Sequence, residues 1–185
     1  VRDQRFKTPA SAELAATAQS WTDFYVSASV CSPSRGALLT GNLPVRSGLY
    51  GNRIAVLWPD SQTGMPASQI TLPEQLKQHN YATAMVGKWH LGEGKPHEPT
   101  GFDYWSVLPG QGEYFDPVMI EMGKERTESG YATDIITDKS LDWLNNRDYD
   151  RPFFLMCHHK APHRNFEPHP RDRDMFNKKD IKVPN

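Results

Sequence analysis

The 185-residue sequence lacks several features that would assign it to a specialised class of protein. Its two cysteines, Cys31 and Cys157, are too few for a disulfide framework and lack the paired spacing of a zinc site. No apolar run approaches the roughly 18 residues that span a bilayer, and the mean hydropathy of -0.67 is that of a polar chain. With a net charge of -1, the chain has no overall field that attracts nucleic acid or a membrane surface.

Both ends of the sequence also lack the features of a complete protein. The chain begins at Val1 without an initiator methionine or a signal-like apolar segment, and it ends in the loop-like stretch IKVPN. We therefore expect residues 1–185 to be part of a single domain that is truncated at both ends. The absence of a targeting signal then says nothing about localisation.

Helix and strand patterns alternate along the chain. We predict helices over residues 8–20, 33–40, 72–80 and 131–145. We predict strands over residues 23–30, 81–87 and 151–157, the last with both faces covered and Cys157 buried. Residues 93–128 are rich in Gly, Pro, Glu and aromatic residues and indicate a long surface excursion, and the tail from His163 onward is predicted to be irregular. This alternation favours an α/β fold with parallel strands.

Polar clusters follow three of the predicted elements: Cys31 to Arg35, Lys88 to His90, and His158 to His163. In open α/β sheets the carboxyl ends of the strands line the ligand crevice. We therefore expect the three clusters to converge on one site.

The first cluster, in VCSPSRGALLTG, places a cysteine where a loop becomes a helix. A group at a helix N-terminus faces unpaired backbone N–H groups and the positive end of the helix dipole, which favour anions. Arg35 stands one turn further along and can direct its guanidinium toward the same point. This position suits an activated thiol nucleophile at Cys31. A partly buried Cys31 beside a solvated Arg35 fits the spacing equally well.

The second cluster, in GKWHLG, places Lys88 and His90 two residues apart after a strand. Alternation in an extended segment directs both side chains to one face, with Trp89 on the other. An ammonium group beside an imidazole suits a tetrahedral anion. The alternative is a surface lysine beside a hydrogen-bonded histidine.

The third cluster, HHKAPHRNFEPH, is rich in basic residues. These are His158, His159, Lys160, His163, Arg164 and His169. The stretch lacks the carboxylates and the closed ligand spacing of a structural metal site. A solvated basic loop accounts for at least half of these residues.

Together these motifs resemble the signatures of the type I sulfatases, members of the alkaline phosphatase-like superfamily. C-x-P-S-R followed by L-T-G is similar to their first signature, GKWHLG to their second, and HHKAPH to the stretch with their third active-site histidine. KTPASAELA resembles the helix before the first signature, so the resemblance runs from about Lys7 to the chain end. It implies an alkaline phosphatase-like α/β sandwich with a largely parallel sheet flanked by helices, of which residues 1–185 are part of the catalytic domain.

The resemblance also implies a chemistry. A formylglycine-generating enzyme would oxidise Cys31 to formylglycine, whose aldehyde hydrates to a diol held by Arg35. One diol hydroxyl attacks the sulfate sulfur, and deprotonation of the other expels sulfate. By the same resemblance, His90 is the base for that step and His163 is the acid or positioning group at the leaving oxygen. The implied substrate contacts are Lys88 and Lys160.

Members of the family hold a calcium ion, or in some cases magnesium, with oxygen ligands. The resemblance implies that Cys31, as formylglycine, supplies one ligand and that an Asp-Asp and an Asp-Asn pair supply others. The chain contains neither dipeptide. We expect these ligands, a further sulfate-binding lysine and a C-terminal domain to lie outside residues 1–185, and the piece alone to be inactive.

The leading interpretation is a sulfuric ester hydrolase of the arylsulfatase or carbohydrate sulfatase type, with carbohydrate sulfates as substrates. A phosphatase or phosphonate hydrolase of the same superfamily is an alternative, because some of these share the cysteine signature. A non-catalytic anion-binding relative with unmodified Cys31 is another alternative, from a different functional class. Relatives are usually secreted, periplasmic or lysosomal.

Overall fold

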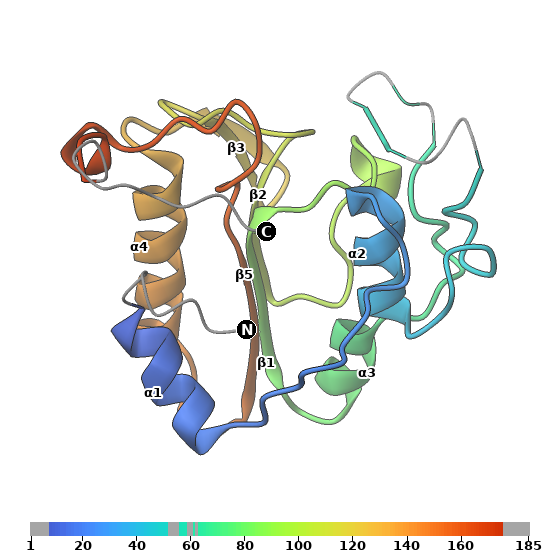
Figure 1. The fold of residues 1–185 in the computed structure, drawn as a ribbon. Coiled ribbons are helices and arrows are strands. Elements are labelled where there is room, and N and C mark those ends of the chain that lie inside the picture. The colour runs from blue at the N-terminus through green and yellow to red at the C-terminus, as the bar shows by residue number, and fades with distance from the viewer. Residues whose placement is uncertain (1–7, 52–55, 59–60, 62, 176–185) are drawn as a thin grey trace.

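A computed structural model of the protein describes residues 8–51, 56–58, 61 and 63–175. It shows a five-stranded sheet between helices (Figure 1). The helices are α1 (Pro9–Thr17), α2 (Cys31–Thr40), α3 (Leu72–Gln78) and α4 (Ala132–Asn146), with 3-10 turns η1 (Lys95–His97) and η2 (Pro170–Asp172). The strands are β1 (Ala82–Lys88), β2 (Tyr104–Leu108), β3 (Val118–Glu121), β4 (Lys124–Thr127) and β5 (Phe153–His158).

The strands lie in the order β4-β3-β2-β1-β5. The central strand β1 pairs in parallel with both β2 and β5, whereas β2, β3 and β4 pair with one another in antiparallel fashion. Helix α4 covers one face of the sheet, and α2 and α3 lie on the other (Figure 1). The predicted α/β class with flanking helices is confirmed, and the central strands are parallel as predicted.

The core forms on both faces of β1, all of whose residues are buried. On the α2 and α3 side, Met85 packs with a cluster that includes Trp89 and Trp105. On the α4 side, Val86 packs with Ile136 and neighbouring residues. A strand buried on both faces is largely apolar, as residues 81–87 are.

Local signals predicted the end of α2 and the start of α3. In contrast, α1 ends at Thr17 rather than at residue 20, and α2 begins at Cys31 rather than at Pro33. Gly41 ends α2 in the left-handed conformation, with φ of 66°, as its place after Thr40 predicts. The side chain of Glu74 caps α3 by accepting a hydrogen bond of 2.8 Å from the backbone N–H of Thr71. No helix among the described residues is long and apolar enough to cross a bilayer.

The prediction of a long surface excursion over residues 93–128 is wrong for β2, β3 and β4. Trp105 and Leu108 are buried because β2 lies directly beside β1. Met122 and Gly123, both with positive φ, make the two-residue turn between β3 and β4. The Gly and Pro residues that indicated a loop lie between these strands rather than within them.

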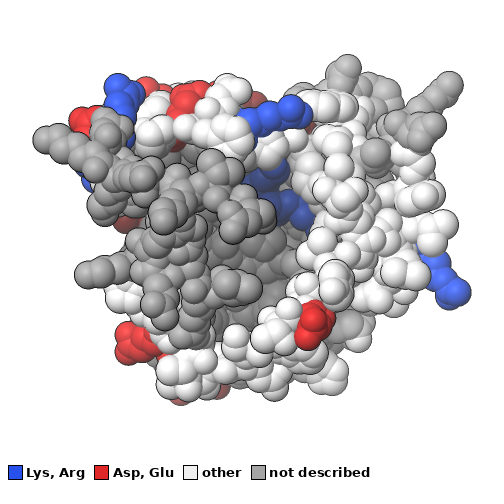
Figure 2. Space-filling view, viewed as in Figure 1, with Lys and Arg blue, Asp and Glu red and all other residues white. Residues whose placement is uncertain are grey.

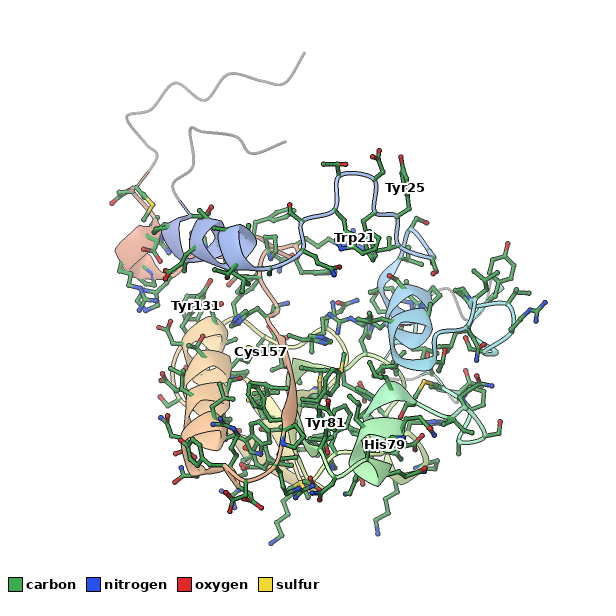
Figure 3. All side chains as sticks on the ribbon, turned by 90° about the horizontal axis from the view of Figure 1, so that it is seen from below. Trp21, Tyr25, His79, Tyr81, Tyr131 and Cys157 are labelled. Atoms are coloured by element: carbon green, nitrogen blue, oxygen red, sulfur yellow. The ribbon has the colours of Figure 1, made fainter. Side chains whose placement is uncertain are left out.

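Two strand predictions also need correction. Residues 23–30 form no strand, and Tyr25 is 85% exposed because no described strand pairs with this segment. Figure 3 shows Trp21 and Tyr25 on the connection between α1 and α2, away from the sheet. Strand β5 exists as predicted but pairs only with β1 among the described strands, so Cys157 is exposed rather than buried. The tail is irregular as predicted apart from η2, and residues 176–185 lie outside the described part.

Candidate active site

Cys31 is the first residue of α2, following the extended residue Val30. Its thiol is free and partly exposed, so it is accessible to a modifying enzyme or a ligand. The first N–H groups of a helix have no partner within the helix, which makes this end favourable for an anion. The next residue, Ser32, is fully buried, and its hydroxyl accepts a hydrogen bond of 3.0 Å from Leu57 N. That contact holds the residue 56–58 segment against the start of α2.

Arg35 connects α2 to the carboxyl ends of two strands. Its Nη1 lies 2.5 Å from the carbonyl oxygen of Lys88, at the end of β1. The same nitrogen lies 2.9 Å from Nδ1 of His158, at the end of β5. The alternative of a solvated Arg35 therefore does not hold.

Lys88 and His90 are both buried, with 4% and 3% of their surface exposed. Burial lowers the pKa of Lys88 to about 8, and the charges of Arg35 and Lys160 add to this effect against an opposite contribution from Cys31. Burial also lowers the pKa of His90 to about 4, helped by the charges of Lys88 and Arg35. His90 is therefore neutral near pH 7. Neither of its ring nitrogens has a hydrogen-bond partner among the described residues.

The loop after β5 brings Lys160 and His163 to the same end of the sheet. Lys160 is 6% exposed, and its Nζ lies 4.6 Å from the centre of the Tyr114 ring. The hydroxyl of Tyr114 donates a hydrogen bond to the carbonyl oxygen of His163. His163 Nδ1 lies 2.7 Å from the carbonyl oxygen of Arg164, which can only accept, so Nδ1 carries a hydrogen.

Gln111 is a residue of the site that the sequence reasoning missed. It lies in the loop after β2, and its side-chain oxygen accepts a hydrogen bond from Lys88 Nζ. Its backbone oxygen accepts one of 3.2 Å from Lys160 Nζ. Gln111 thus holds the two lysines at one place. Its two flanking glycines indicated only a loop, because the sequence predicted no strand within residues 93–128.

The structure brings the predicted site residues together at the carboxyl ends of β1 and β5. Figure 2 shows Lys and Arg side chains set back in a hollow, while the Asp and Glu residues visible on this face lie toward its periphery. The expectation that a solvated loop accounts for at least half of the third cluster is wrong. Of its six basic residues, His159 and Arg164 are exposed, and His169 packs edge-on against Tyr131. Several cations beside a helix N-terminus favour an anionic ligand.

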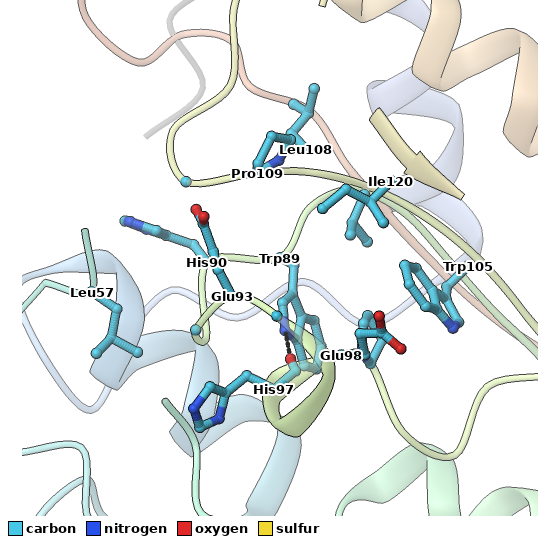
Figure 4. Close-up of a pocket in the computed structure, with 15 residues that line it drawn as sticks. Leu57, Trp89, His90, Glu93, His97, Glu98, Trp105, Leu108, Pro109 and Ile120 are labelled. Atoms are coloured by element: carbon cyan, nitrogen blue, oxygen red, sulfur yellow. Dashed lines mark hydrogen bonds between the residues drawn. The ribbon is translucent and has the colours of Figure 1, made fainter. Parts of the chain in front are cut away.

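A mostly apolar pocket lies on the inner side of His90. Figure 4 shows it between His90, Leu57 and the tryptophans Trp89 and Trp105. Trp89 points into this pocket and donates a hydrogen bond of 2.8 Å to the carbonyl oxygen of His97. Trp89 thus lies in the core, as predicted. The alternation predicted for an extended segment is wrong at His90, which has φ of 60° and lines the same pocket as Trp89.

The described residues do not make a metal site. They contain no group of three or more His, Cys, Asp or Glu side chains that could hold an ion. A calcium ion takes six to eight oxygen ligands, and an oxygen at position 31 supplies at most one or two. The described residues therefore do not fit a complete calcium centre.

Comparison with known proteins assigns the family. The sulfatase family model matches residues 1–182. The chain belongs to the sulfatase family. A sulfatase relative, the N-acetylglucosamine-6-O-sulfatase of Bacteroides thetaiotaomicron, is 42% identical over 174 residues, which are 92% of this chain and 29% of the relative. Human arylsulfatase A is 52% identical over 108 residues, which are 55% of this chain and 20% of that protein.

Solved sulfatase structures have the same fold. One, described as a complex with its substrate D-glucosamine-2-N,6-O-disulfate, matches with a TM-score of 0.77 and 42% identity. The match covers 88% of this chain and 31% of that one. The chain thus spans less than a third of the length of the two curated relatives and this structure.

Proposed function

We propose that the complete protein is a sulfuric ester hydrolase that cleaves sulfate esters of carbohydrates, with formylglycine made from Cys31 as its nucleophile. The observation that supports this most is the place of Cys31, at the start of α2 and beside the buried cations Arg35 and Lys88. Negative charge that develops on sulfate oxygens is stabilised by such fixed positive groups. The sulfatase relatives support the same class of reaction.

Formylglycine, when present as its hydrate, would supply one hydroxyl that attacks sulfur and a second whose deprotonation releases sulfate. In this proposal Arg35 orients the group at position 31, because its Nε and Nη2 remain for that contact while Nη1 is bound elsewhere. Lys88 and Lys160 bind the sulfate oxygens through charge-assisted hydrogen bonds. Gln111, which holds both ammonium groups, keeps them at the spacing that one sulfate group needs.

Two histidines have the proton-transfer roles in this proposal. His90 is the base, since its low pKa of about 4 keeps it neutral and its ring nitrogens are unoccupied in the described structure. His163 is the acid at the leaving oxygen in its imidazolium form, in which Nδ1–H is engaged by the Arg164 carbonyl and the proton on Nε2 is the one transferred to the substrate. Each such role is typically worth ~10²–10⁴-fold in rate.

The proposed substrate class is a sulfated saccharide. A relative is called an N-acetylglucosamine-6-O-sulfatase, and a matching structure is described with a disulfated glucosamine. The exposed Arg164 beside His163 adds a positive group suited to an anionic sugar. The proposed partners are a formylglycine-generating enzyme, which acts on Cys31, and a calcium or magnesium ion whose other ligands come from outside residues 1–185. No step above depends on that ion.

The test compares turnover of D-glucosamine 6-sulfate and the matching 6-phosphate by the complete protein made with a formylglycine-generating enzyme. We expect sulfate release with the higher kcat/KM, and none from a Cys31→Ala control. A higher kcat/KM on the phosphate would favour the phosphatase alternative. Binding of the sulfate ester without turnover would favour the non-catalytic alternative.

A further inference from the structure

His158 is a partly buried histidine that has no role in the mechanism above. It is the last residue of β5, where it pairs with Gly87 of β1. Its Nδ1 lies 2.9 Å from Nη1 of Arg35. Burial, followed by the charge of Arg35, lowers the pKa of His158 to about 4.

The contact with Arg35 determines the protonation of His158. A guanidinium group has only donors, so Nδ1 of His158 must present its lone pair and its proton must be on Nε2. A protonated His158 would lose this acceptor and place a second positive charge against Arg35. The neutral ring is therefore the form that this contact requires.

The same nitrogen of Arg35 has a second acceptor, the carbonyl oxygen of Lys88 at 2.5 Å. One acceptor stands at the end of β1 and the other at the end of β5, so two neighbouring strands hold one guanidinium group. Gly87 permits this arrangement, because a Cβ on it would lie 2.0 Å from the carbonyl oxygen of His158. Both contacts use Nη1, so neither of them occupies Nη2 or Nε of Arg35.

We propose that His158 is a positioning residue that fixes the guanidinium group of Arg35 toward residue 31 and its sulfate ligand. An unrestrained arginine side chain has several rotatable bonds whose freedom is lost when it binds a ligand. Arg35 held by His158 has lost most of that freedom before the ligand arrives. This inference rests on the proposed function for its effect on the rate.

The experiment replaces His158 in the complete protein with Asn and with Leu. The side-chain oxygen of Asn stands near the place of Nδ1 and can accept from Arg35, whereas Leu fills similar space without an acceptor. We expect His158→Leu to lower kcat about 10- to 100-fold, with a smaller change in KM, because one charge-assisted hydrogen bond is lost. His158→Asn should retain activity within about threefold. Rates are normalised to the formylglycine content of each preparation.

A second readout is the affinity for inorganic sulfate, measured by calorimetry. We expect His158→Leu to weaken the affinity for sulfate and His158→Asn to keep it near the wild-type value. This comparison remains decisive if the wild-type protein binds sulfate without catalysing hydrolysis. If His158→Leu does not fold, His158→Gln replaces it, since its oxygen reaches beyond the position of Nδ1. The proposal is overturned if His158→Asn has the same activity and the same sulfate affinity as His158→Leu, or as His158→Gln where that variant replaces His158→Leu. Loss of wild-type turnover alone would overturn only the proposed function.

Discussion

Gly87 offers the most direct test of how the site is built. It lies in β1 with φ of 103°, and a Cβ there would stand 2.0 Å from the carbonyl oxygen of His158 and 2.9 Å from its carbonyl carbon. Cβ atoms essentially never come within 3.0 Å of a neighbouring atom, so Gly87→Ala must separate β1 from β5 by on the order of 1 Å. This separation breaks the strand pairing that positions His158 and the Lys88 carbonyl around Arg35.

The size of the effect follows from two contributions. Alanine at a positive φ costs about 1 kcal/mol relative to glycine. The new Cβ also collides with backbone atoms, which cannot rotate away as a side chain can. This collision lowers the free energy of unfolding by about 3 kcal/mol or more, which places Gly87→Ala among the most destabilising substitutions. Gly41→Ala is the matched control, because Gly41 has φ of 66° but nothing within 4 Å of its Cβ position. Gly41→Ala should therefore show only the cost of alanine at a positive φ.

The assay is thermal unfolding of the complete protein and of both variants. We expect Gly87→Ala to lower Tm by about 5–10 °C more than Gly41→Ala does, and to lower turnover of a sulfate ester at temperatures where it is folded. Gly41→Ala should keep wild-type turnover. Equal Tm values for the two variants would refute the close approach of β5 to Gly87, and with it the account of how Arg35 is held.

Three further predictions concern the chemistry. His163→Ala should lower kcat/KM on a sugar sulfate by ~10²–10⁴-fold but much less on nitrophenyl sulfate, whose leaving group needs no proton; equal losses would remove His163 from the acid role. Inhibition by inorganic sulfate should weaken as pH rises through about 8, where Lys88 loses the charge that binds the anion, and Lys88→Arg should remove this dependence. Inhibition by the wild type that stays constant across that range would contradict a Lys88 contact. The isolated 185-residue piece should not hydrolyse an aryl sulfate even with excess calcium, because its described residues form no metal site; turnover would show that our account of the metal is wrong.

Local signals in the sequence predicted the elements that depend on neighbours in the chain. Gly41 and the Glu74 cap define helix ends through contacts within a few residues, and β1 is a mostly apolar segment that is buried along its whole length. Two of the signature motifs follow the parallel strands β1 and β5, so their convergence could be predicted from the rule for parallel sheets. That rule does not explain the place of Cys31, because no strand forms over residues 23–30.

Long-range contacts explain what the sequence did not predict. Gln111 stands 23 residues from Lys88, and its contact depends on β2 pairing with β1. His158 stands 123 residues from Arg35 and has a role only because Gly87 lets β5 approach. Residues 23–30 look like a strand because they are apolar and β-prone, yet a strand also requires a partner, which composition does not reveal.

The central claim is that Cys31 is the precursor of the nucleophile. The most direct measurement is mass spectrometry of the peptide that contains Cys31, from the complete protein made together with a formylglycine-generating enzyme. We predict an aldehyde in place of the thiol at position 31, with Cys157 unchanged as the internal control. A peptide that contains only unmodified cysteine at position 31 under these conditions would contradict the proposed mechanism.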